Sequence, residues 1–269
     1  MKVLTYNVHG WQSPEGGSNL ALVAEVIAAS AADVVGLNEV FHSAGAMDQP
    51  PLSVLAAQLK MAYAFGPTQP ADLHPNHPPY GNALLSRWPI VAHAAHHLSP
   101  AVSYGTRGLL DVRLLLPLGV PFTVYVTHLD HRSEEVRVAQ WSAANSWLLR
   151  DRSRPHLVIG DFNALAQTDY EAPDARRRLA AYQAQRGWPA PAFDLVDQVL
   201  RAGYIDAFVA AGNDPMSGAT YPASAPERRI DYIFLSSPAA DALRACAPLV
   251  ADAGPKASDH MAVCAELAL

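Results

Sequence analysis

The sequence predicts an α/β protein, and three observations support this fold class. Short aliphatic and β-branched runs such as Leu157–Ile159 are typical of strands buried on both faces of a sheet. Between such runs lie stretches whose apolar residues recur at helical spacing. Half of the 269 residues are hydrophobic, which is enough for a large core. No repeat, linker-like stretch or block of like charges divides the chain, so we expect one domain over residues 1–269.

In the first part of the chain, strands are expected at 2–8, 33–40 and 61–65, and helices at 18–30 and 52–60. Ser18 or Asn19 is a candidate N-cap of the first helix. The stretch 66–80 is rich in proline, which fixes φ and lacks an amide donor, so we expect a loop there. The segments 81–87 and 90–97 are typical of a β-hairpin that turns at Trp88–Pro89.

The second part begins with two expected strands, 107–116 and 121–129. The clearest helix is 133–150: Ser133 can cap it, and two glutamates follow where the helix dipole favours anions. Its predicted apolar face consists of Val136, Ala139, Ala143 and Trp147. Further helices are expected at 175–186 and 195–201, a second loop at 212–226, and strands at 229–235, 242–250 and 261–269.

Polar residues follow the buried strand at 157–159. Gly160 permits an unusual backbone turn, and Asp161 and Asn163 come next, two residues apart. In an extended segment such side chains point to the same side, so they are expected to converge. An Asx turn that simply closes the strand is an equally good interpretation of this stretch alone.

Other predicted strands end in the same manner, at Asn7, Glu39, His128, Asp231 and the pair Asp259–His260. Singly, each could be a turn residue, a capping carboxylate or a core histidine. Asp231 is harder to explain in this way, because a carboxylate buried inside a strand needs a partner. Their joint occurrence favours a catalytic site.

At these positions the chain resembles the endonuclease/exonuclease/phosphatase superfamily, and most closely its small uncharacterised bacterial members. The matching motifs, in family order, are TYNVHG (5–10), NEV (38–40), GNALLSR (81–87), THLDH (127–131), GDFNA (160–164), RIDYIF (229–234) and SDH (258–260). The resemblance implies a four-layer α/β sandwich of two mixed β-sheets packed face to face, with helices on the outside. It also implies a metal-dependent phosphoesterase.

The resemblance further implies roles for individual residues. Glu39 matches the principal metal ligand, with Asn7 and Asp259 close to the ion. Asp161 matches the group that positions or deprotonates the attacking water, and Asn163 the group that holds phosphate or nucleophile. His260 matches a histidine paired with a carboxylate, here Asp231. His128 matches a second histidine that donates to phosphate oxygens.

Several further residues are candidates near the site. Arg107 matches an arginine that faces the substrate phosphate in several members, although a surface arginine is the alternative. Asn82 is expected at the edge of the cleft. Less specific candidates are Tyr80, Asp130 and His131, and the histidines at 42, 93, 96, 97 and 156 are interpreted as structural or exposed.

The chemistry of a phosphodiester accounts for these residue types. The ester is anionic, so a hard cation on oxygen ligands offsets the charge that repels a nucleophile. Carboxylate and carboxamide oxygens suit Mg²⁺ or Mn²⁺ better than zinc. The attacking water needs a base, and the sequence leaves open whether Asp161 or His260 takes the proton.

The substrate is predicted from charge and loops. The net charge is −6, and neither 66–80 nor 212–226 contains lysine or arginine, so a nucleic-acid surface is not favoured. Abasic-site endonucleases usually carry a tyrosine where His128 stands. We therefore expect a phosphodiesterase acting on a small or lipid-like diester. A DNA or RNA nuclease is the alternative, and a phosphomonoesterase or an inactive binding module is less favoured.

Composition gives three smaller expectations. Cys246 and Cys264 lie in apolar surroundings and are expected to be free buried thiols. No 18-residue apolar span or signal-peptide pattern occurs, so a cytoplasmic protein without a transmembrane segment is expected. The sequence implies no protein partner.

Overall fold

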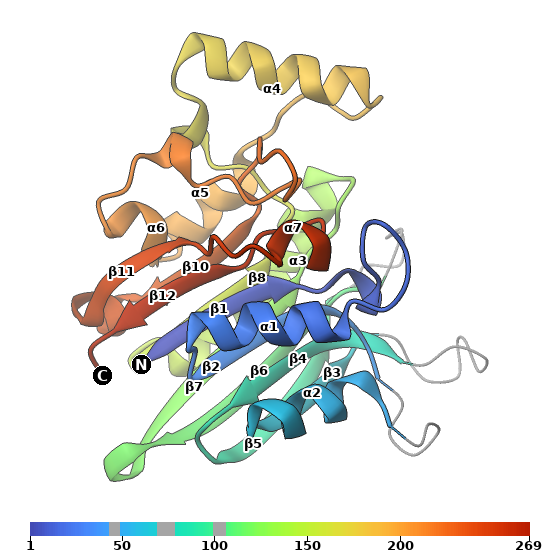
Figure 1. The fold of residues 1–269 in the computed structure, drawn as a ribbon. Coiled ribbons are helices and arrows are strands. Elements are labelled where there is room, and N and C mark those ends of the chain that lie inside the picture. Colours follow the sequence, from blue (N-terminus) through green and yellow to red (C-terminus); the bar gives the residue numbers. More distant parts are fainter. Residues whose placement is uncertain (43–48, 69–78, 99–105) are drawn as a thin grey trace.

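The computed structural model describes residues 1–42, 49–68, 79–98 and 106–269. Two six-stranded sheets pack against each other, with helices outside them (Figure 1). The architecture is the predicted four-layer α/β sandwich, so the expected fold class is confirmed. In this part of the chain no helix is both long and apolar enough to cross a membrane.

Each sheet is mixed, with one parallel pair at its centre. The first sheet runs, in spatial order, β11 (Leu243–Pro248), β12 (Val263–Leu267), β1 (Lys2–Asn7), β2 (Val34–Phe41), β4 (Tyr80–Ser86) and β3 (Ala62–Pro67). The second runs β5 (Ile90–His97), β6 (Gly108–Leu116), β7 (Val120–His128), β8 (His156–Asp161), β10 (Asp231–Ser236) and β9 (Tyr204–Asp206). The parallel pairs are β1–β2 and β7–β8. Their carboxyl ends carry Asn7, Glu39, His128 and Asp161.

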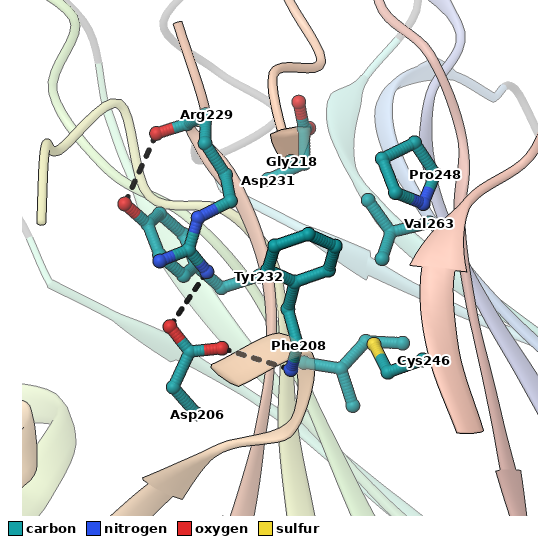
Figure 2. A pocket seen from close by; sticks show the side chains of 10 residues that line it. Asp206, Phe208, Gly218, Arg229, Asp231, Tyr232, Cys246, Pro248 and Val263 are labelled. Atoms are coloured by element: carbon teal, nitrogen blue, oxygen red, sulfur yellow. Dashed lines mark hydrogen bonds and ion pairs between the residues drawn. The ribbon is translucent and has the colours of Figure 1, made fainter. Parts of the chain in front are cut away.

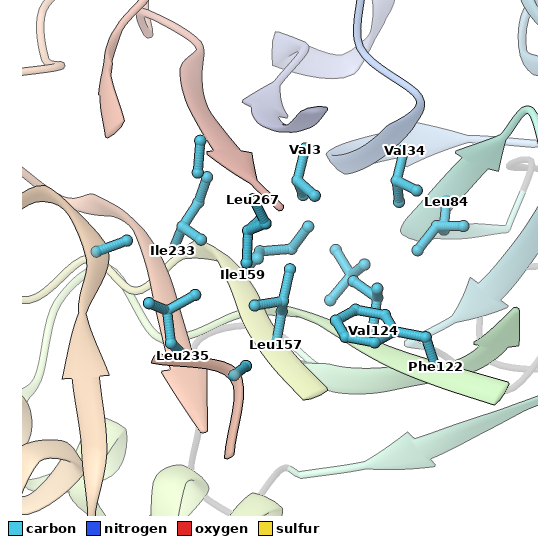
Figure 3. Close-up of a cluster of buried hydrophobic side chains, with 14 of the residues drawn as sticks. Val3, Val34, Leu84, Phe122, Val124, Leu157, Ile159, Ile233, Leu235 and Leu267 are labelled. Carbon is cyan, nitrogen blue, oxygen red and sulfur yellow. The ribbon is translucent and has the colours of Figure 1, made fainter. Parts of the chain in front are cut away.

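The main core fills the space between the two sheets (Figure 3). Val3 and Val34 of the first sheet belong to the same fully buried cluster as Leu157 and Ile159 of the second. At Gly36 a Cβ atom would lie 2.6 Å from Ile159 Cδ1, so glycine is needed where the central strands approach. This close approach brings the polar strand ends of both sheets together.

Helices cover the outer faces of the sheets. Helices α1 (Leu20–Ser30) and α2 (Pro51–Leu59) share an apolar cluster with the first sheet. Helices α3 (Glu134–Leu148) and α5 (Asp194–Arg201) share one with the second sheet. Helix α4 (Pro173–Gln185) lies beyond one end of the sheets, at the top of Figure 1. Helices α6 (Ala207–Ala210) and α7 (Gly254–Ala257) are shorter, with four residues each.

The predicted hairpin of residues 81–87 and 90–97 is wrong. Both segments are strands, but β4 lies between β2 and β3, so both of its edges are already paired. The chain instead crosses between the sheets at Arg87–Pro89. The amide of Arg87 donates to Asp33 O beside the first sheet, and Pro89 O accepts from Leu115 in the second.

The predicted apolar face of α3 is also wrong. Ser133 Oγ accepts from the amide of Val136, so the N-cap is as expected, but Trp147 is 42% exposed. The buried face contains Arg137 and Gln140, whose side chains bind the backbone of Asp130. The spacing of apolar residues does not predict the buried face of α3, because two polar residues, Arg137 and Gln140, are buried where they hold the turn before the helix.

The loop expected at 66–80 is only partly covered. Residues 69–78 lie outside the described residues, while Gly66 and Pro67 end β3 and Tyr80 begins β4. The other predicted strands and helices lie where they were expected, within a few residues, whereas β9, α6 and α7 were not predicted. Asn19 precedes α1 without capping it, since its side-chain amide donates to the carbonyls of Val8, Gln12 and Ala257.

Candidate active site

Asp161 is the last residue of β8 and is 1% exposed. Its Oδ1 accepts from the amide of Asn163 at 2.9 Å, which is an Asx turn. Asn163 is left-handed (φ 51°) rather than extended, yet its Nδ2 still lies 3.1 Å from His128 Nε2. His128 Nε2 is also 3.5 Å from Asp161 Oδ2. The two interpretations of this stretch therefore hold together: it is an Asx turn, and its two side chains both approach His128 Nε2.

Asn7 joins the two sheets at this point. It ends β1 and is 1% exposed. Its Nδ2 donates to Asp161 Oδ2 at 3.0 Å and to Glu39 Oε1 at 3.1 Å. One amide of the first sheet thus holds a carboxylate from each sheet.

Glu39 lies in a bulge of β2. The register of β2 against β4 shifts between Leu37 and Val40, and Glu39 has φ 58°. A left-handed backbone at a residue other than glycine costs roughly 1–3 kcal/mol and is commonest at functional sites. The bulge turns the half-exposed Glu39 carboxylate toward Asn7.

Asp231 and His260 form a buried pair. His260 Nδ1 lies 2.9 Å from Asp231 Oδ2, and Thr220 Oγ1 donates to the same oxygen at 2.6 Å. The other ring nitrogen, Nε2, lies 3.7 Å from Asp161 Oδ2. Asp231 therefore fixes the orientation of a ring that points its second nitrogen at Asp161.

Burial and neighbouring charges shift the pKa values of His260 and Asp161. Burial by itself would lower the pKa of His260, but the carboxylates of Asp231 and Asp161 outweigh it and raise that pKa to about 10. Burial raises the pKa of Asp161 to about 7, against the opposing charge of His260. At neutral pH, His260 is an imidazolium beside a carboxyl group that can gain or lose a proton.

His128 has different neighbours. Arg107 Nη1 lies 3.0 Å from His128 Nδ1, and Arg107 Nη2 lies 3.3 Å from His131 Nδ1. The Tyr80 hydroxyl is 3.5 Å from both His128 Nδ1 and Arg107 Nη1. Burial and the Arg107 charge lower the pKa of His128 well below its ordinary value, so this ring is neutral.

Two of the candidates near the site make structural contacts. Asn82 is 1% exposed, and its amide nitrogen binds the carbonyls of Gly108 and Val126, so it fastens the two sheets together. Its role at the edge of a cleft stays a prediction. Asp130 is fully buried and accepts from the amides of Arg132 and Ser133 before α3. The five remaining histidines named above are buried in structural contacts, stacked on a ring or exposed, as expected.

Two positioning residues were not identified from the sequence. Asn38 Oδ1 accepts from the amide of Asp161, and Asn38 Nδ2 binds Asn82 Oδ1 and the carbonyl of Thr127. Thr220 supports Asp231 from a loop. The available signal for Asn38 was a carboxamide directly after the apolar run of β2, and no signal pointed to Thr220.

Arg229 anchors the start of β10. It is 3% exposed, and its guanidinium binds Asp169 Oδ1 and Oδ2 at 2.8 and 2.9 Å and Asp206 Oδ2 at 2.6 Å. Figure 2 shows this side chain beside the ring of Tyr232, reaching Asp206. A buried charge so fully paired fixes the strand that presents Asp231 two residues later.

The oxygen donors fit a hard divalent cation. Glu39 supplies a carboxylate whose Oε2 has no hydrogen-bond partner among the described residues, and Asn7 supplies a carboxamide beside it. Asp259 is half-buried next to Ser258, whose Oγ lies 2.7 Å from Asn7 O. Ligand atoms of Asp161, Asp231 and His260 also lie within 4.8 Å of one another, but His260 Nδ1 already binds Asp231. Of the two groups, the oxygen set around Glu39 suits Mg²⁺ or Mn²⁺ better.

Comparison with solved structures identifies the same fold in several proteins. An endonuclease/exonuclease/phosphatase from Beutenbergia cavernae DSM 12333 is 26% identical, with a TM-score of 0.74 over 100% of this chain and 71% of that chain. The mannosyl-6-phosphatase Bt3783 of Bacteroides thetaiotaomicron VPI-5482 is 18% identical, with a TM-score of 0.68 over 100% of both chains. The human Nocturnin catalytic domain with bound sulfate anion is 20% identical, with a TM-score of 0.70 over 100% of this chain and 94% of that chain.

A search of curated proteins found no match to the sequence. The model of the Endonuclease/Exonuclease/phosphatase family, in contrast, matches residues 4–260. That range includes every strand end described above, from Asn7 to His260. The chain belongs to the Endonuclease/Exonuclease/phosphatase family.

Proposed function

We propose that this protein is a divalent-metal-dependent phosphodiesterase that hydrolyses a small or lipid-like phosphodiester by in-line attack of an activated water. The observation that carries the proposal is the group formed by Asp161, His260 and Asp231, placed against Asn7 and Glu39 of the facing sheet. It combines a base, a cation and hard oxygen ligands, which is what hydrolysis of an anionic ester needs.

The pKa shifts of Asp161 and His260 favour Asp161 as the general base and His260 as a charged hydrogen-bond donor. With a pKa near 7, Asp161 can accept the proton that water loses as its oxygen bonds to phosphorus. With a pKa near 10, His260 keeps its proton and donates a hydrogen bond to a phosphate oxygen that gains charge. Asp231 holds His260 in the charged form throughout.

The remaining residues orient the phosphate. Glu39 and Asn7, with Asp259 nearby, would hold Mg²⁺ or Mn²⁺, which neutralises charge on the phosphate oxygens when bound. Asn163 and His128 lie beside Asp161, where they can donate hydrogen bonds to the same phosphate. As the water oxygen bonds to phosphorus, the opposite ester bond breaks and its oxygen leaves with the electron pair.

A compact substrate is favoured by charge. The net charge of −6 opposes long-range attraction of a polyanion, and the loop 212–226 carries no lysine or arginine. We expect bis-p-nitrophenyl phosphate to be hydrolysed faster than plasmid DNA at equal phosphate concentration, with weak salt dependence. A DNA or RNA nuclease remains the alternative, and efficient nicking that falls steeply with salt would select it.

The test is a substrate panel with and without metal. The substrates are bis-p-nitrophenyl phosphate, p-nitrophenyl phosphate, plasmid DNA, RNA, sphingomyelin and inositol phosphates. EDTA should abolish hydrolysis, and Mg²⁺ or Mn²⁺ should restore it. Glu39→Gln should raise the metal concentration needed for half-maximal rate, because one charged ligand is lost. The exposed Glu25 of α1 gives the matched control, Glu25→Gln. Full turnover in chelator would contradict the proposal.

A further inference from the structure

Arg228 lies in an aromatic cluster next to the catalytic group. Its guanidinium carbon is 4.4 Å from the ring centre of Trp188, 4.8 Å from that of Tyr221 and 5.5 Å from that of Tyr182. The three rings come from separate parts of the chain: the end of α4, the segment after it, and the loop before β10. Faces of aromatic rings attract a guanidinium but leave its N–H groups, which lie in its plane, without acceptors.

The neighbouring arginine shows what a purely structural arginine looks like here. Arg229 has two carboxylate partners. Among the described residues the Arg228 guanidinium has no hydrogen-bond or ion-pair partner, and its Nε is buried and unsatisfied. A charged group held in this way retains its capacity to bind an anion, because the rings stabilise the cation without using its donors.

The loop that carries Arg228 is fastened to the catalytic group. Tyr221 and Arg228 exchange backbone hydrogen bonds at 2.9 and 3.0 Å, and the ring of Tyr221 packs on that of His260 with centroids 5.0 Å apart. Ala223 N donates to Asp259 O at 2.7 Å, so the loop is also tied to the turn that carries His260. One aromatic ring therefore separates the unpaired guanidinium from His260.

We propose that Arg228 forms a second anion-binding subsite, so that the preferred substrate is a compact phosphodiester with an additional phosphate or comparable anion. The subsite rests on the proposed phosphodiesterase activity and specifies its substrate class. A lipid-like diester without a second anionic group would leave the Arg228 donors unpaired on binding, whereas a second phosphate would satisfy them.

The test uses two substrates that differ by one phosphate: the nitrophenyl phosphodiester of thymidine 5′-phosphate, and the same compound with a further 3′-phosphate. The wild-type enzyme should favour the phosphorylated compound in kcat/KM by roughly tenfold, as one charge-assisted pair would give. Arg228→Gln should lose this preference through a higher KM for that compound alone. Arg228→Lys, which keeps the charge, should retain part of it.

Controls separate this subsite from a structural role and from the activity itself. Arg177→Gln removes an exposed charge from α4, the helix that carries Tyr182. Arg177 pairs with Asp174 there, and the variant should hydrolyse both substrates at the wild-type rate. An equal loss on both substrates in Arg228→Gln would show that Arg228 only supports packing. Calorimetric titration with thymidine 3′,5′-bisphosphate and with thymidine monophosphate tests the contact without turnover. Equal affinities would overturn the subsite even if the diesterase activity stands, whereas absence of hydrolysis with unequal affinities would overturn only the activity.

Discussion

His260 and His128 both approach the same carboxylate oxygen, at 3.7 and 3.5 Å from Asp161 Oδ2. Behind His260 lies a carboxylate, Asp231, while behind His128 lies a guanidinium, Arg107. The pKa of His260 is accordingly raised to about 10, and that of His128 is lowered well below its ordinary value. Both rings are buried, so the partner behind each ring sets the difference.

This comparison shows how one fold can place a charged and a neutral imidazole at a single carboxylate oxygen, Asp161 Oδ2. A charged donor stabilises negative charge that develops during reaction, whereas a neutral ring mainly orients. We therefore expect the two histidines to differ in how much they contribute and in how their contributions depend on pH.

The largest expected effect concerns the charged side. Asp231→Asn and His260→Ala should each lower kcat by about 10²–10⁴-fold, the usual contribution of a positioned acid or base. The double variant should lose little more, because residues that act as a unit are non-additive. Steady-state kinetics with bis-p-nitrophenyl phosphate measures this, and Asp252→Asn, an exposed acid near the same turn, is the control. If the two losses multiply, the residues work separately.

A smaller effect is expected on the neutral side. His128→Gln keeps a hydrogen-bonding group but removes the ring, and should lower kcat/KM by about 10-fold, since a neutral hydrogen bond contributes less than a charged one. The pH profile should keep its shape, because His128 does not change charge in the working range. A loss as large as that of His260→Ala would mean that His128 also carries charge in the reaction.

The smallest effect is on stability. The pKa of His260 is raised from 6.5 to about 10 on folding, so its charged form contributes stability that is fully present below pH 6.5 and is lost as pH rises through about 10. His260→Gln cannot titrate. In chelator, the Tm difference between wild type and His260→Gln should therefore shrink toward pH 10. A difference that stays constant from pH 6 to 10 would show that His260 is neutral in the fold.

The sequence predicts the strands and their polar ends well, because these features are local. Buried runs such as Leu157–Ile159 are recognisable by composition, and the groups that end them, Asp161 among them, follow directly. Which sheet a strand joins depends on partners far along the chain, which is why β4 and β5 were wrongly paired. The catalytic roles of the polar residues at the strand ends stay predictions until the variants are measured.

Other features could not be predicted because they depend on packing between distant segments. Asn82 and Asp130 carry suitable side chains, but burial against backbone groups gives them structural contacts. Arg228 was not identified as a candidate, because the aromatic residues that surround it, Tyr182, Trp188 and Tyr221, come from separate parts of the chain. Spacing along a chain can indicate which residues share a face, but not which segments fold over it.

The bulge at Glu39 has a consequence for how this fold can change. A glycine at position 39 would suit φ 58° without strain, so the backbone favours a residue that has no side chain. Selection for stability alone would therefore favour replacing Glu39 by glycine, and the proposed metal ligand would be lost. In a protein of this fold that has lost the activity, we expect the change first at this position. The bulge in β2 identifies the position by its backbone geometry, even where the sequences are too different to align.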